Sequence, residues 1–136
     1  MSEKQKQNCH VVWFRNDLRI QDNSSLTNAM KTSKKVIAIY CFDPRHFEET
    51  EFGFKKTGKF RAKFLLETVK NLQQNLKEKL NVNLLVYHDY PEDVFKSLAE
   101  KYLIEEVFLQ REWTQEEINV QRKVEQILPK VKFTES

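Results

Sequence analysis

Glycine is nearly absent from this sequence: 136 residues contain only Gly53 and Gly58. Neither belongs to a G-x-G-x-x-G stretch, and the chain has no P-loop motif. A backbone approaches a pyrophosphate closely only where glycine removes the side chain. The sequence therefore argues against a dinucleotide bound in the usual Rossmann manner.

Cysteine and histidine are also scarce, with two and three residues respectively, and their spacing matches no metal-ligand pattern. We predict no metal site. No nucleophile with a neighbouring base stands out either, so no catalytic residue is predicted. Cys9 and Cys41 fall in or beside predicted strands, where a free cysteine behaves as a small buried hydrophobic residue.

Long apolar runs are missing as well, because no stretch approaches the roughly 20 residues that span a bilayer. The polar start, MSEKQKQN, is not followed by the apolar segment of a secretory signal, so a cytoplasmic location is expected. The 23 basic residues are largely offset by 20 acidic ones, and a net charge of +3 is not by itself a nucleic-acid footprint.

What the sequence does contain is an alternation of short apolar runs with amphipathic segments. The apolar runs predict strands near residues 9–14, 35–42, 82–87, 106–109 and 131–133. The segments between them predict helices at about 24–31, 59–80, 91–102 and 114–128. In the longest helix, an apolar stripe at helical spacing predicts core positions, namely Phe60, Phe64, Leu65, Val69, Leu72, Leu76 and Leu80. Residues 44–57 are predicted to form a long loop.

This order of elements predicts one α/β domain over residues 1–136, with a Rossmann-like, doubly wound parallel sheet. Right-handed crossovers and one reversal give five strands in the order 3-2-1-4-5, with helices on both faces. The first and fourth strands are then neighbours. Their exit segments, residues 15–19 and 110–117, are expected to face one another across the switch-point crevice, where ligands bind in open α/β sheets.

Charged and aromatic residues gather at the predicted strand exits, and we predict that they form a ligand site. They are Arg15, Asp43, Arg111, Trp113, Glu116 and Glu117. A carboxylate in an aromatic-lined cleft suits a planar heterocycle that carries paired N–H donors. An alternative for the first loop is that its alternating charges pair with one another and hold the turn together. For Glu117 the alternative is a capping box with Thr114 at the start of the last helix.

The stretch WFRNDLR, followed shortly by DN, resembles the opening signature of the photolyase and cryptochrome family. The stretches CFDPRHF, EFGFKKTGKFRAKFL and the PEDV of residues 91–94 are similar to DASH-type cryptochromes in particular. The resemblance covers nearly the whole chain, but only the N-terminal α/β domain of the family. No stretch corresponds to the larger helical domain.

The resemblance implies that this domain houses an antenna chromophore, commonly methenyltetrahydrofolate, and acts as a scaffold. In the family, reduced FAD in the helical domain drives light-dependent repair of pyrimidine dimers, as in a deoxyribodipyrimidine photolyase, or supports blue-light sensing. The implied partners are therefore that helical domain and, through the full-length protein, DNA. We expect the 136 residues alone to hold no flavin and to repair no DNA.

The resemblance also suggests a role for Glu117. The motif EVNER of folate-binding relatives aligns with TQEEI here and places the pterin-binding acid on Glu117, whereas Glu116 stands where those relatives have Asn. A rival function from another class is a stand-alone nucleotide-binding α/β module. The lack of a glycine-rich loop argues against that module, and titration with ATP discriminates between the two.

Overall fold

The computed structural model describes residues 7–15, 18, 23–31, 35–42 and 55–135, with only the main chain at 7 and 55–62. Its strands are β1 (Gln7–Phe14), β2 (Lys35–Cys41), β3 (Leu84–Tyr87), β4 (Tyr102–Leu109) and β5 (Lys132–Glu135). They form one five-stranded sheet in the order β3-β2-β1-β4-β5, and every neighbouring pair is parallel. The predicted fold class and strand order are confirmed.

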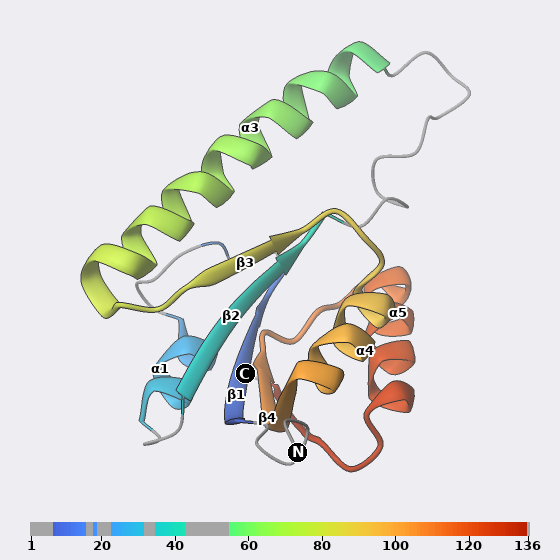
Figure 1. The fold of residues 1–136 in the computed structure, drawn as a ribbon. Helices are drawn as coiled ribbons and strands as arrows, with labels where there is room; N and C mark the ends of the chain where they lie inside the picture. The colour runs from blue at the N-terminus through green and yellow to red at the C-terminus, as the bar shows by residue number, and fades with distance from the viewer. Residues whose placement is uncertain (1–6, 16–17, 19–22, 32–34, 43–54, 136) are drawn as a thin grey trace.

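Helices cover both faces of the sheet. They are α1 (Ser24–Met30), α3 (Lys55–Asn75), which continues into the π-helical turn η2 (Leu76–Leu80), α4 (Pro91–Lys101) and α5 (Gln115–Ile127). Figure 1 shows α1 and α3 on one side of the strands, and α4 and α5 on the other. Asn23 caps α1 by accepting from the Leu26 amide at 3.0 Å. Asn81, in the left-handed conformation with φ 54°, ends η2.

Two hydrophobic cores follow from the alternation of side chains along β1. Val11 and Trp13 point to the α4 and α5 side, where Trp13 meets Phe95 edge-on with ring centroids 5.0 Å apart. Val12 and Phe14 point to the α1 and α3 side. Burial of β1 on both faces explains its continuous apolar run, since a central parallel strand is covered by helices above and below.

Strand β4 begins earlier than predicted, because residues 102–105 belong to it as well. Its pairing with β1 shifts register between Cys9 and His10: Cys9 lies opposite Ile104, whereas His10 lies opposite Glu106. Glu105 is thus the extra residue of a β-bulge. Two adjacent acids, one of them the bulge residue, hide the start of the strand in the sequence, because they interrupt the apolar run from which a strand is predicted. The other strands differ from their predicted bounds by one or two residues at one end or, for β5, at both ends.

The longest helix also departs from its prediction in two respects. It starts at Lys55, so residues 55–57 are helical and not part of a loop, while residues 43–54 lie outside the described part of the chain. Phe64, a predicted core residue, is 72% exposed. Leu65, Val69, Leu72 and Leu76 form the stripe that packs on the sheet. Phe64 lies about 100° around the helix from Leu65, and this rotation carries it off the buried face.

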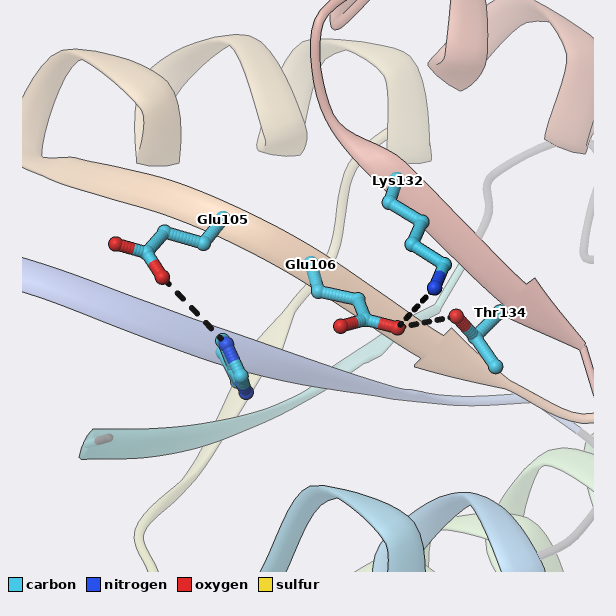
Figure 2. Close-up of polar contacts among 5 residues, drawn as sticks. Glu105, Glu106, Lys132 and Thr134 are labelled. Atoms are coloured by element: carbon cyan, nitrogen blue, oxygen red, sulfur yellow. Dashed lines mark hydrogen bonds and ion pairs between the residues drawn. The ribbon is translucent and has the colours of Figure 1, made fainter. Parts of the chain in front are cut away.

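The edge strand β5 is joined to β4 by polar side chains as well as by the parallel ladder (Figure 2). The Thr134 hydroxyl donates a hydrogen bond to Glu106 Oε2, and Lys132 Nζ lies 4.0 Å from the same oxygen. On the helix side, Gln121 Nε2 donates to Glu135 Oε2 at 2.7 Å. These contacts fix the register of a strand that has a neighbour on one side only.

Candidate functional site at the switch point

The exits of β1 and β4 meet where the strand order reverses, as the sequence predicts. Arg15 directly follows β1, and its Nη2 donates to the main-chain oxygen of Glu117 in the first turn of α5, at 2.9 Å. The two residues are 102 positions apart in the chain. Two of the predicted site residues are therefore brought into direct contact, and the half-buried Arg15 side chain reaches from the end of β1 to the first turn of α5.

Arg15 also lies over an aromatic ring. Its guanidinium carbon is 4.6 Å from the ring centroid of Trp13, a distance at which the ring quadrupole attracts the cation. Trp13 itself is buried in the core of the α4 and α5 side. Arg15 is thus held between the sheet and α5, a position in which it fixes the geometry of the site.

The N-terminus of α5 is closed by a complete capping box. Thr114 Oγ1 accepts from the Glu117 amide at 3.2 Å and donates to Glu117 Oε1 at 2.8 Å. The Thr114 amide donates to the same carboxylate oxygen at 3.4 Å. Glu116 is exposed in the first turn, where the helix dipole favours an acid. The predicted capping role of Glu117 is confirmed, and the hydrogen bonds of its carboxylate to Thr114 are exposed to solvent.

The segment between β4 and α5 presents an aromatic ring to solvent. Trp113 is 78% exposed, and the guanidinium carbon of Arg111 lies 4.9 Å from its ring centroid. Arg111 is exposed too. An indole left so open to water offers a flat apolar surface for stacking. Both residues lie on the segment that leads from β4 to α5.

Two further residues complete the account of the predicted site. Glu112 is not among the predicted residues, although it is only 7% exposed while both of its neighbours face solvent. Its burial has no signal in the sequence, because β4 ends in three consecutive buried residues, Val107 to Leu109, and no alternation of buried and exposed positions can be continued past its end. Asp43, another predicted site residue, lies outside the described residues.

The remaining features of the described residues bear less on this site. Among them, no group of three or more His, Cys, Asp and Glu side chains is arranged to hold a metal ion. Within the same residues, no helix is both long and apolar enough to cross a membrane. A hollow of about 350 Å³ lies at α1, lined by Asn23, Ser24, Thr27, Asn28 and Lys31, and contains none of the predicted site residues.

The chain was compared with known protein families, proteins and structures. The model of the DNA photolyase family matches residues 10–136. The chain belongs to the DNA photolyase family. Several of its curated relatives are DASH-type cryptochromes. Cryptochrome DASH of Gloeobacter violaceus is 45% identical over 118 residues, which is 87% of this chain and 23% of that protein. Cryptochrome DASH of Synechocystis is 42% identical over 84% of this chain and 23% of that protein.

Solved structures agree with the fold of this photolyase-family domain. The Synechocystis cryptochrome superposes with a TM-score of 0.87 at 37% identity, over 96% of this chain and 27% of that one. A photolyase from Sulfolobus tokodaii, solved with two FAD molecules, gives a TM-score of 0.75 at 21% identity over 94% of this chain and 28% of that one. The chain thus corresponds to the N-terminal α/β domain of DASH-type members, and spans about a quarter of its relatives' length.

Proposed function

We propose that the switch-point edge binds an antenna chromophore, a reduced folate of the methenyltetrahydrofolate type. The domain would serve as light-collecting module and scaffold in a DASH-type flavoprotein that repairs pyrimidine dimers or senses blue light. One observation carries the proposal: the Arg15–Glu117 hydrogen bond joins the exits of β1 and β4 into one edge that presents a carboxylate. Ligands of open α/β sheets bind at such a position.

The chemistry of the edge fits a pterin. An ionised carboxylate accepts two parallel N–H bonds from a flat heterocycle, and charge-assisted bonds of this kind are worth about 1.5–3 kcal/mol each. The exposed ring of Trp113 supplies a stacking surface, and Arg111 beside it supplies a cation for an anionic tail. The alignment of Glu117 with the pterin-binding acid of folate-binding relatives supports the same assignment. Glu116 is a second acid in reach of the edge.

The rest of the activity is assigned to the longer protein. The curated relatives are about four times as long as this chain, and the Sulfolobus tokodaii structure holds FAD. We place flavin binding and DNA contact in a helical domain of a protein of that length, which also supplies the second wall of the antenna pocket. With one wall only, the 136 residues are expected to bind folate weakly and to hold no flavin.

Nuclear magnetic resonance titration tests the proposal at millimolar ligand. Methenyltetrahydrofolate is expected to shift the amide signals of Thr114 and Glu117, and Glu117→Gln is expected to weaken binding about tenfold by removing the charge. Glu100→Gln, an exposed acid on α4, is the matched control. ATP tests the rival nucleotide-binding module. Micromolar binding of ATP, or equal folate affinity of the Glu117→Gln and native chains, would refute the folate assignment.

A further inference from the structure

The main chain of Glu117 is fixed on both sides. Its amide donates to Thr114 Oγ1 at 3.2 Å, and its carbonyl oxygen accepts from Arg15 Nη2 at 2.9 Å. The side chain of Glu117 can therefore change rotamer while the main chain stays in place. Within the capping box, both contacts of its carboxylate go to Thr114 and both use Oε1.

These carboxylate contacts are exposed to solvent. Exposed hydrogen bonds are readily exchanged, because water or a ligand compensates the donors that are released. The bond from the Glu117 amide to Thr114 Oγ1 does not involve the carboxylate, so the helix keeps its N-cap when the carboxylate leaves. The capping box thus consists of the bond from the Glu117 amide to Thr114 Oγ1, which caps the helix, and of the two bonds to the Glu117 carboxylate, which a ligand can replace.

We propose that Thr114 regulates ligand binding at the switch point by competing with the ligand for the carboxylate of Glu117. The Thr114 hydroxyl and amide both donate to Glu117 Oε1. When a planar heterocycle binds, its two parallel N–H donors replace the Thr114 donors at the Glu117 carboxylate. The hydrogen of the Thr114 hydroxyl then turns to solvent, while its oxygen still caps α5. Thr114 is a positioning residue in this scheme, and the inference rests on the proposed function.

The substitution Thr114→Asn separates the two parts of the box. Asn ranks with the best N-cap residues, so its side-chain oxygen retains the bond from the Glu117 amide. With that oxygen turned toward the helix, we expect the NH₂ group on the other side of the planar amide to point away from Oε1, so that only the main-chain amide of residue 114 still donates to the carboxylate. Thr114→Ser keeps the hydroxyl and is the matched control.

The experiment is a titration of the native chain and both variants with methenyltetrahydrofolate, followed by amide shifts. Loss of one exposed competing bond is expected to tighten binding about three- to tenfold in Thr114→Asn and to leave Thr114→Ser unchanged. The gain must vanish when Glu117→Gln is added, because the ligand no longer meets a carboxylate. Such dependence on Glu117 is not expected of a residue that merely caps the helix.

The outcomes separate this inference from the proposed function. Two outcomes overturn the inference alone. In one, folate shifts the amide signals at the switch point but binds the native and Thr114→Asn chains with equal affinity. In the other, the gain in affinity of Thr114→Asn persists when Glu117→Gln is added. Absence of folate shifts in every variant overturns both. If Thr114→Asn fails to fold, the test is made on the native chain, whose Thr114 amide signal must shift as methenyltetrahydrofolate is added. An unchanged Thr114 signal beside shifting neighbours overturns the proposal that the ligand replaces Thr114 at the carboxylate.

Discussion

Arg15 and Glu117 are hydrogen-bonded across the point at which the sheet reverses its strand order, with Arg15 Nη2 2.9 Å from the Glu117 carbonyl oxygen. The bond links the first strand to the last helix. It also fixes the first turn of α5 against the end of β1, so the acid of the proposed site has a defined distance from the sheet. Coupling of the two elements through one side chain makes the link testable.

Replacing Arg15 by Lys is expected to lower the free energy of unfolding by about 1–2 kcal/mol. Lys keeps the charge but loses the planar group that reaches the Glu117 carbonyl and lies over Trp13 at 4.6 Å. Urea unfolding of the native and variant chains measures the change. Hydrogen exchange should locate the loosening in the first turn of α5.

Arg122, an exposed residue of α5, provides the matched control for Arg15. Arg122→Lys is expected to change the free energy of unfolding by less than about 0.5 kcal/mol, as surface substitutions usually do. If both variants show the same small change, the Arg15 bond is not a stabilising link between β1 and α5.

The capping box gives a second prediction about Glu117, one that concerns stability. Glu117→Gln retains a side-chain acceptor for the Thr114 donors and should cost less than about 0.5 kcal/mol. Glu117→Ala removes the acceptor and should cost about 1 kcal/mol. Thermal unfolding followed by circular dichroism compares the two. An equal loss in both variants would mean that the charge, and not the hydrogen bonding, stabilises α5.

The general fold could be predicted from the sequence because its signals are local and repeated. The apolar run of β2 and the helical spacing of Val69, Leu72 and Leu76 each specify their own element, and the parallel order then follows from chain connectivity. The start of β4 could not be predicted, because Glu105 is a bulge whose reason lies in the pairing with β1. Local sequence does not contain that partner.

The candidate site, like the fold, could be predicted from the sequence only in part. The capping box of Thr114 and Glu117 could be predicted, because its motif lies within four consecutive residues. The bond between Arg15 and the Glu117 carbonyl was not, because its acceptor is a main-chain atom and carries no sequence signature. Topology alone supplied the expectation that the two segments meet.

A third prediction tests the departure of Phe64 from the core. Phe64 is 72% exposed, so Phe64→Ala should change the free energy of unfolding by less than about 0.5 kcal/mol. Leu72, on the buried face of the same helix, is the contrasting site, and Leu72→Ala should cost about 2–5 kcal/mol. Urea unfolding measures both. A loss of 2 kcal/mol or more at Phe64 would indicate that this ring belongs to the core.

The last prediction concerns alkaline pH and starts from three titratable side chains of the sheet, those of Cys9, Tyr40 and Tyr87. Burial raises the pKa of the Cys9 thiol from 9.0 to about 11, partly opposed by the charge of Lys35 and reinforced by that of Glu105. Burial likewise raises the pKa of Tyr40 from 10.0 to about 12 and that of Tyr87 above its usual value. In each case the folded chain holds the proton more tightly than the unfolded chain.

Stability should therefore be fully present below pH 9 and fall as the pH rises, because the unfolded chain ionises first. For Cys9 alone the loss is expected to be about 1 kcal/mol by pH 10, and it continues until the folded thiol ionises near its pKa of about 11. Tyr40 and Tyr87 extend the decline to higher pH. Urea unfolding at pH 8 and pH 10 measures the difference. Cys9→Ala lacks the thiol, so its stability should fall less over this interval, whatever its stability at pH 8. An equal fall in the native and Cys9→Ala chains would show that Cys9 does not contribute to the alkaline loss.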